Sequence, residues 1–354
     1  MSATTETILD DFRDRIRARK PLQIRGGGSK DFYGGPLHGE LLDTRAYAGI
    51  VSHEPTELVV TARCGTPLAE LESALAAQRQ FLACEPPHFA GAATVGGAVA
   101  SGLSGPRRAA VGSLRDFVLG VKIMDGEGRI LKFGGEVMKN VAGFDVSRLM
   151  AGSLGTLGLI LEVSLKVLPL PLGDATLRFA MSQDEALKAL NQWAGQPLPL
   201  VASCWAEEGL TIRLSGAVAA VNSACTKLGG ERVADEAAAA LWRALRDQTL
   251  PFFAGDGPLW RVSVPSVAPA LNLPGTQLIE WGGAQRWLRG ELDAAAVFAL
   301  AAKVGGHATA FRGGDRVAGV FTPLAPPLLE VHRRLKQSFD PYGAFNPGRL
   351  YAEL

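Results

Sequence analysis

Glycine is concentrated in the first part of this chain. The sequence contains 42 glycines in 354 residues, well above the usual share of about 7%. Before residue 160 they gather at positions 26–28, 34–35, 91–105, 134–135 and 152–158. Because glycine tolerates positive φ and lets the backbone approach a ligand closely, we expect loops in this region that are built around a bound molecule.

The composition argues against several classes of protein. The chain is 47% hydrophobic and 20% charged, with a formal net charge of +1, which is unlike a dedicated nucleic-acid-binding protein. No apolar run approaches the roughly 20 residues of a membrane-spanning helix, and the first residues lack the pattern of a secretory signal. The four cysteines are too scattered for a metal or iron–sulfur site and too few for a disulfide framework. We therefore expect a cytoplasmic, globular protein without a metal ion.

The pattern of residue types changes near residue 170, and the length of the chain is typical of about two domains. The segment Leu168-Pro-Leu-Pro-Leu-Gly173 cannot extend a strand ladder, because proline lacks the N–H donor. Beyond it, strand-like runs alternate with alanine-rich helices, which is an α+β composition. Before it, the patterns predict an amphipathic helix at residues 7–19 and strands at 22–25, 57–63, 117–124, 129–133 and 158–168.

The first glycine cluster directly follows a predicted strand. It consists of Arg25, Gly26, Gly27, Gly28, Ser29 and Lys30. Consecutive backbone N–H groups in such a loop bind anions, and flanking cations add to the field. The segment is therefore either a cradle for a pyrophosphate or an ordinary glycine turn. It is neither a Walker loop nor a Rossmann fingerprint, because the residues that each motif requires do not follow.

Two further segments are rich in small residues. The first extends from Thr94 through Gly96 and Gly97 to Ser101; it is interpreted either as a ligand-binding loop with hydroxyl donors or as a tightly packed helix start. The second follows Lys139–Asp145 and leads into an apolar run, which favours a tight loop that enters a sheet. Its candidate binding residues are Gly152, Gly155, Thr156, Gly158 and Ile160.

Taken together, these segments resemble the FAD-binding domain of the vanillyl-alcohol oxidase (PCMH) type. The matching strings are "R-G-G-G-S", "A-T-V-G-G-A-V-A-S-G", "V-G-S-L-R-D-F-V-L-G-V-K-I-M-D-G-E-G" and "K-N-V-A-G-F-D-V-S-R-L-M-A-G-S-L-G-T-L-G-L-I". The closing "F-D-P-Y-G-A-F-N-P-G-R-L" is similar to the end of the hydroxy-acid oxidase branch. The match covers residues 22–170 and 321–352 densely and the middle hardly at all.

The resemblance implies a fold and a cofactor. It implies an α+β fold in which FAD lies between two α+β subdomains, with the pyrophosphate on Gly26–Ser29 and the flavin and ribityl side lined by residues 94–101 and 152–160. Some relatives attach flavin covalently through a histidine near the first loop. This loop has none, and the nearest downstream is His38, so noncovalent FAD is expected. The expected domains are an FAD-binding domain at 1–170, a short α+β cap at 171–320, and a segment at 321–354 that returns to the FAD domain.

The same resemblance narrows the expected function. Hydroxy-acid dehydrogenases of this family carry a His-x-Gly-Asp-Gly-Asn-x-His segment in a larger cap, and this chain lacks it. A short chain of this pattern resembles the accessory flavin-fold subunits of bacterial glycolate oxidase complexes, which oxidise glycolate to glyoxylate. The implied partners are a larger catalytic flavoprotein subunit (D) and an iron–sulfur subunit (F), and through them the inner face of the cell membrane.

Candidate catalytic residues are few. Oxidation of a 2-hydroxy acid needs a base for the hydroxyl proton and a cation for the carboxylate. His307 is the candidate base. Arg312 and Arg316 could each bind a carboxylate through bidentate hydrogen bonds from the guanidinium group. The alternative places all three on a solvated loop or in structural roles. Two further functions also stay open: a stand-alone FAD-dependent 2-hydroxy-acid dehydrogenase, and a non-catalytic scaffold subunit that keeps the flavin fold.

The six tryptophans all lie between residues 193 and 287. Tryptophan is enriched both in protein interfaces and in cores. Trp281 and Trp287 flank the glycine-rich run Gly282-Gly-Ala-Gln-Arg286. That setting predicts that one of the two is exposed and available for docking to another subunit, with core packing as the alternative.

Overall fold

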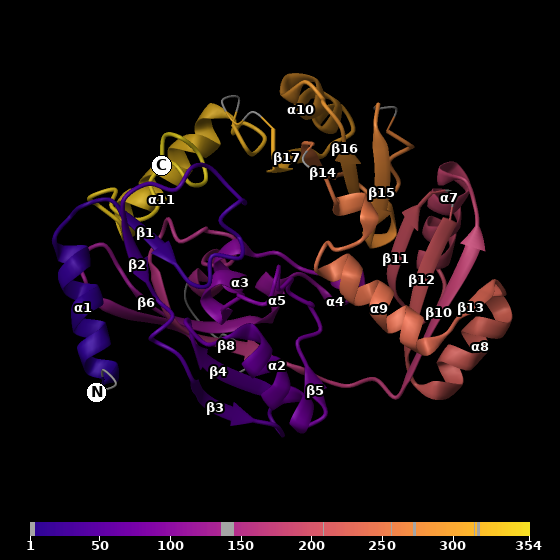
Figure 1. The fold of residues 1–354 in the computed structure, drawn as a ribbon, viewed down its shortest axis with the longest axis horizontal. Helices are drawn as coiled ribbons and strands as arrows, with labels where there is room; N and C mark the ends of the chain where they lie inside the picture. The colour runs from indigo at the N-terminus through magenta and orange to yellow at the C-terminus, as the bar shows by residue number, and fades with distance from the viewer. Residues whose placement is uncertain are drawn as a thin grey trace. The chain divides into compact units, whose positions relative to one another are not determined.

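The computed structural model describes residues 4–135, 145–207, 209–255, 257–271, 274–314, 316 and 319–354 (Figure 1). The chain forms two compact units, each made of helices and sheets, as expected for the α+β class. The first unit contains Met1–Leu103, Ser113–Pro169 and Pro323–Leu354, and the second contains Ser104–Gly112 and Leu170–Thr322.

The first unit is built on an antiparallel sheet of five strands. Its order is β3-β4-β8-β6-β7, with β3 at Ile50–Glu54, β4 at Val59–Arg63, β8 at Leu159–Lys166, β6 at Val118–Met124 and β7 at Ile130–Gly134. The central strand β8 is buried at six of its eight residues, which explains its nearly continuous apolar sequence. The strands predicted at 117–124 and 129–133 are β6 and β7, and the Asp125–Gly128 turn joins them as a hairpin: Asp125 Oδ1 accepts hydrogen bonds from the N–H groups of Glu127 and Arg129.

Two small strand pairs and the helices complete this unit. A parallel pair joins β1 (Leu22–Arg25) to β2 (Glu40–Asp43), and an antiparallel pair joins β5 (Gln80–Phe81) to β9 (Leu168–Pro169). The prediction that the proline-rich segment takes no part in a ladder was therefore wrong for Leu168 and Pro169, because a short edge pair tolerates proline. The helices are α1 (Thr5–Arg17), α2 (Leu68–Ala77), α3 (Val95–Ser101), α5 (Leu114–Phe117), α6 (Val146–Leu149) and α11 (Pro326–Phe339).

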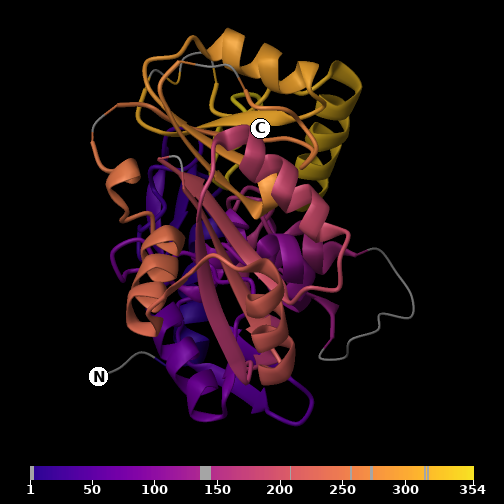
Figure 2. The ribbon, with the colours of Figure 1, turned by 90° about the vertical axis from the view of Figure 1, so that its right-hand side faces the viewer.

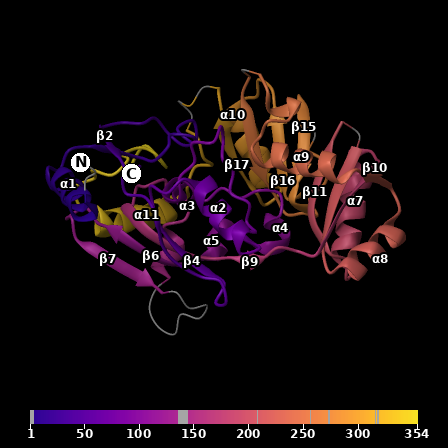
Figure 3. The same ribbon diagram turned by 60° about the horizontal axis from the view of Figure 1, so that its bottom comes forward.

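The carboxy-terminal segment joins this unit through one buried ion pair on α11. The Lys336 ammonium group donates hydrogen bonds to Asp340 Oδ2 at 2.7 Å and to the carbonyl oxygens of Thr156 and Phe345, each at 2.8 Å. The Asp340 carboxylate also accepts hydrogen bonds from the N–H groups of Ala344 and Phe345. These five residues are called the Lys336 cluster below. Beside it, the end of α11 packs against the β6–β7 hairpin (Figure 3), where the rings of Phe339 and Phe133 are 6.2 Å apart.

The second unit is built on an antiparallel sheet of eight strands (Figures 1 and 2). The order is β13-β10-β12-β11-β15-β16-β14-β17, with β13 at Glu231–Val233, β10 at Gly173–Ala180, β12 at Gly209–Gly216, β11 at Leu200–Ala206, β15 at Thr276–Glu280, β16 at Gln285–Arg289, β14 at Leu259–Ser263 and β17 at His307–Arg312. The helices are α4 (Arg108–Val111), α7 (Gln183–Ala194), α8 (Val218–Leu228), α9 (Asp235–Arg246) and α10 (Ala294–Lys303), with 3-10 turns η1 (Pro251–Phe253) and η2 (Trp281–Gly283).

Both tryptophans of the glycine-rich run are buried in this unit. Trp281 is 8% exposed and Trp287 is 3% exposed, so the prediction of an exposed docking tryptophan was wrong. Trp287 lies on β16 between β14 and β15, and its ring packs edge-on against Phe253 and Phe311. Its indole N–H donates to Glu280 at 2.6 Å. The glycines around it serve a tight turn rather than a surface loop.

No helix in the described part of the chain is long and apolar enough to cross a membrane. All four cysteines are unpaired, and three of them are buried. Among the described residues, no group of three or more histidine, cysteine, aspartate or glutamate side chains converges on a point where a metal ion could bind.

We predict that Lys336→Met destabilises the protein strongly, by about 3–5 kcal/mol, because the substitution leaves the Asp340 carboxylate buried without its cation. The matched control is Arg334→Met, which removes another i,i+4 ion pair of α11 whose two side chains are 79% and 49% exposed. Such a pair contributes less than about 1 kcal/mol. Urea unfolding of the two variants measures the difference, and equal effects would show that the Lys336 cluster has no special role.

Candidate functional site

The first glycine loop follows β1 and packs tightly against residues 92–94. A Cβ atom at Gly27 would lie 1.5 Å from the carbonyl oxygen of Ala92, and one at Gly26 would lie 2.2 Å from Thr94 Oγ1. Gly28 has φ +75°, which favours glycine. The local fold therefore requires glycine at all three positions.

The loop presents a row of hydrogen-bond donors. Among the described residues, the N–H groups of Gly26, Gly27, Gly28 and Ser29 donate to no protein acceptor. Arg25 reaches over the loop and pairs with Asp31 at 2.5 Å, while its Nε is buried without a partner. Unpaired amides in a concave loop form an anion-binding nest, and a buried guanidinium nitrogen without an acceptor is costly unless a ligand supplies one.

The loop forms one wall of a hollow of about 80 Å³. This is far smaller than the roughly 300–1,000 Å³ of a pocket that encloses a whole ligand, so it fits one polar part of a larger molecule. Nine of the predicted binding residues line it, namely Arg25, Gly26, Gly27, Gly28, Ser29, Lys30, Thr94, Gly97 and Ser101.

The second small-residue segment is the start of α3, as one of its two interpretations proposed. Thr94 is the N-cap, and its Oγ1 accepts a hydrogen bond from the Gly97 N–H at 3.3 Å. Gly96 faces away from the hollow: its N–H donates to the Cys64 carbonyl at 2.8 Å, and a Cβ there would lie 2.6 Å from the Cys64 Cβ. The Ser101 hydroxyl donates to the Ala98 carbonyl. Ser101 also lines the hollow.

The third segment supports the site from behind. The N–H groups of Gly152 and Leu154 donate to Val99 and Ala100 of α3, and the Thr156 hydroxyl donates to the Ser153 carbonyl. Because these donors are used by the fold, the segment holds α3 in place. Gly155 and Gly158 have φ of +73° and +159°, Ile160 is buried in β8, and none of the five predicted residues of this segment lines the hollow. The preceding residues 139–144 lie outside the described residues.

Two functional candidates from the carboxy-terminal segment were missed at the level of sequence. Asn346 accepts from the Ile24 N–H and donates to the Leu154 carbonyl, each at 2.7 Å. Arg349 donates to the carbonyl oxygens of Gly35, Lys30 and Asp31. Both line the hollow, and their hydrogen bonds hold the residues at the two ends of the first glycine loop. The string Asn346-Pro-Gly-Arg349 was the available signal, but its partners lie between 192 and 322 residues away.

Two of the three candidate catalytic residues, His307 and Arg312, do not converge. His307 and Arg312 begin and end β17, which separates them by roughly 16 Å. Arg312 donates to Gln248 at 2.9 Å. His307 lies at the surface. Partial burial of its ring, together with the charges of Arg261 and Arg108, lowers its pKa. Burial also lowers the pKa of Arg316. Their catalytic roles stay a prediction.

The residues around the first loop fit the pyrophosphate of a dinucleotide. Four unpaired N–H groups and the orphaned Arg25 Nε supply donors, and the glycines leave room for close approach. The hydrogen-bond donors around the hollow are cationic or polar, and the hollow fits the phosphate-containing part of a larger molecule. The structural evidence therefore agrees with the cofactor that the sequence resemblance implied.

Comparisons with known proteins agree with this site. A family model described as an FAD binding domain matches residues 4–134. The chain is 51% identical over 350 residues to glycolate oxidase subunit GlcE of Escherichia coli, covering 99% of this chain and 98% of that protein. It is 31% identical over 162 residues to glycolate oxidase subunit GlcD of Bacillus subtilis, covering 45% of this chain and 34% of that protein. Over 186 residues it is 29% identical to D-lactate dehydrogenase of Archaeoglobus fulgidus, covering 51% and 41%.

Among solved structures, alkyldihydroxyacetonephosphate synthase has the same fold. The TM-score is 0.67 at 16% sequence identity, covering 97% of this chain and 74% of that one. Together with the family model, this likeness confirms the predicted PCMH-type FAD-binding fold.

We predict that Gly27→Ala weakens FAD binding, because the added methyl group overlaps the Ala92 carbonyl and displaces the donor loop. Overpacking of this kind costs enough for a loss in affinity of about fivefold to a hundredfold. The control is Gly257→Ala, since a Cβ at Gly257 meets no atom within 4 Å. The FAD content of each purified variant, titrated back with free FAD, measures the effect, and unchanged affinity in Gly27→Ala would contradict the assignment.

Proposed function

The chain belongs to the family of glycolate oxidase subunit GlcE, and we propose that it acts as the FAD-binding accessory subunit of a glycolate oxidase complex. It is an FAD-dependent oxidoreductase subunit, and the identity with the Escherichia coli protein extends over nearly the full length of both chains. The observation that supports the role best is the row of unpaired N–H groups at Gly26–Ser29 beside the orphaned Arg25 Nε.

In this proposal the first unit holds noncovalent FAD. Gly26–Ser29 donate to the pyrophosphate, Arg25 and Lys30 offset its charge, and Thr94 and Ser101 contribute hydroxyl groups. Asn346 and Arg349 keep the loop in position: the Asn346 side chain accepts a hydrogen bond from the Ile24 N–H, and Arg349 donates to the Lys30 carbonyl. When bound, FAD accepts the two electrons that leave a 2-hydroxy acid on its oxidation to a 2-oxo acid.

Substrate oxidation itself is assigned to the partner. His307 and Arg312 lie at opposite ends of β17, so these two candidates do not act together on one substrate, and the sequence lacks the histidine-rich segment of catalytic relatives. We therefore assign the oxidation of glycolate to glyoxylate to the larger flavoprotein of the complex. Electrons then leave through the iron–sulfur partner, and these two partners attach the complex to the inner face of the cell membrane.

The first test is the visible spectrum of the chain purified alone, followed by denaturation to release the cofactor. We expect a flavin spectrum and stoichiometric release of free FAD, because no residue of the first loop can form a covalent link. A colourless chain that gains no spectrum with added FAD would instead support the scaffold role.

The second test adds glycolate without oxygen. We expect the flavin of the isolated chain to stay oxidised and to bleach only when the larger flavoprotein partner is present. Bleaching of the isolated chain would contradict the accessory role and show a stand-alone dehydrogenase. Lactate, tested in parallel, reports which 2-hydroxy acid the complex prefers.

A further inference from the structure

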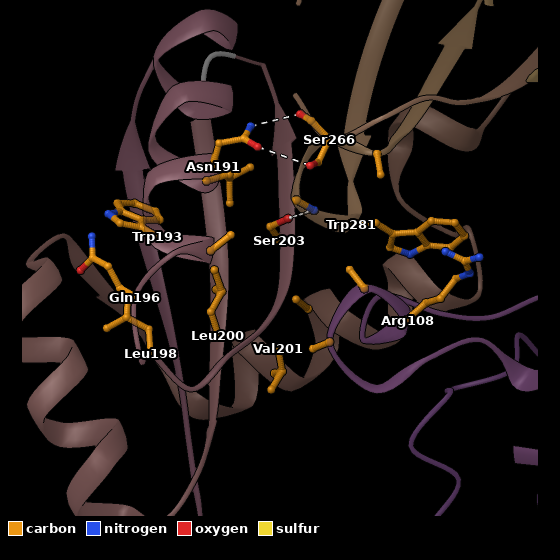
Figure 4. Close-up of a pocket in the computed structure, with 17 residues that line it drawn as sticks. Arg108, Asn191, Trp193, Gln196, Leu198, Leu200, Val201, Ser203, Ser266 and Trp281 are labelled. Atoms are coloured by element: carbon orange, nitrogen blue, oxygen red, sulfur yellow. Dashed lines mark hydrogen bonds between the residues drawn. The ribbon is translucent and has the colours of Figure 1, made fainter. Parts of the chain in front are cut away.

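A cavity of about 460 Å³ lies within the second unit (Figure 4). It is formed by α4, the end of α7, the start of β11 and the turn η2. We propose that this cavity, called the Trp281 cavity, binds a small organic anion with a flat apolar body. The proposal does not depend on the proposed function of the chain.

The volume and walls of the cavity are those of a ligand site. Pockets for small molecules usually enclose about 300–1,000 Å³ and are mostly apolar with a few placed polar groups. Here the side chains of Leu190, Leu198, Leu200 and Val201 form apolar wall, and Trp193 and Trp281 lie on opposite sides of the lining residues. A planar apolar group that lies against the leucine side chains or one of the indoles would cover apolar surface of the wall.

The base of the cavity is a constrained turn. Trp281, Gly282 and Gly283 have φ of +55°, +65° and +100°, and a tryptophan in this region costs conformational free energy. The turn is held by the Gly282 N–H, which donates to Ser203 Oγ at 3.0 Å, and by the Trp281 indole N–H, which donates to the Gly105 carbonyl at 3.1 Å. A Cβ at Gly282 would meet no atom within 4 Å, so the turn presents open backbone to the cavity.

A second set of hydrogen bonds fixes the wall beside this turn. Asn191 Nδ2 donates to the carbonyl oxygens of Leu187 and Ser266, and the Ser266 hydroxyl donates to Asn191 Oδ1 (Figure 4). These bonds connect α7 to Ser266, which follows β14. The cavity is therefore preformed, which lowers the conformational cost of binding.

The charge at the cavity selects the class of ligand. Arg108 is the one charged side chain among the described residues that line it, and its guanidinium lies 4.5 Å from the centre of the Trp281 ring. A guanidinium stacked on an indole keeps its positive charge, and that charge attracts a carboxylate or sulfonate. Glycolate, which has no apolar body, gains nothing from the aliphatic and indole walls.

The test uses two fluorescent probes with the purified chain. The first is 1-anilinonaphthalene-8-sulfonate, and the second is N-phenyl-1-naphthylamine, which has the same ring system without the charge. We expect Arg108→Gln to weaken binding of the sulfonate by about threefold to fivefold, the range of a solvent-accessible ion pair, and to leave the neutral probe unchanged. The matched control is Arg243→Gln, an exposed arginine on α9, which should change neither affinity.

A second pair of variants tests the cavity itself. Ala194→Leu adds bulk at the cavity wall and should weaken both probes, whereas Ala240→Leu, on an exposed position of α9, should weaken neither. Absence of binding by the unmodified chain, or equal effects of each variant and its control, would overturn the proposal. Displacement of the sulfonate probe by millimolar glycolate would also overturn it, because the cavity would then be a substrate site.

Discussion

The geometry of the candidate site depends on the buried pair Lys336 and Asp340. Lys336 holds the carbonyl of Thr156, next to the loop that supports α3, and Asp340 fixes the N–H groups of Ala344 and Phe345. From that point the chain runs beside β1: Leu22 donates to the Ala344 carbonyl, and Asn346 donates to the Leu22 carbonyl. The strand that carries the first glycine loop is thus aligned by residues at the far end of the sequence.

A buried ion pair at this junction carries a desolvation cost. Burial lowers the pKa of Lys336, and the charge and hydrogen bond of Asp340 oppose that change. An apolar pair of similar volume often gives equal or greater stability, but it could not bind two carbonyl oxygens and two N–H groups in fixed directions. The cluster therefore contributes position as well as stability. Asn346 and Arg349 extend the same principle, since each binds backbone carbonyls of segments that are remote in sequence.

Sequence patterns predicted the parts of this protein that local chemistry determines. The Asp125–Gly128 turn follows from two glycines beside an aspartate, and α1 follows from periodic apolar residues. The clamp by Asn346 and Arg349 could not be predicted, because a contact across 300 residues leaves no periodic trace. Trp287 was misjudged because nearby glycines are typical of surface loops, whereas pairing on both edges of β16 buries it. The membership of Ser104–Gly112 in the second unit likewise has no local signature.

The glycine clusters that first suggested a ligand have two separate causes. At Gly26 and Gly27 a side chain would collide with Thr94 or Ala92, so packing alone requires glycine there, with or without a cofactor. Packing does not account for the N–H groups of the same loop, because they have no acceptor among the described residues. The same distinction applies to Gly152 and Thr156, whose donors are already used by the fold. We therefore infer the anion site from the unsatisfied donors rather than from the glycines, and we assign it to the first loop and the adjoining guanidinium of Arg25.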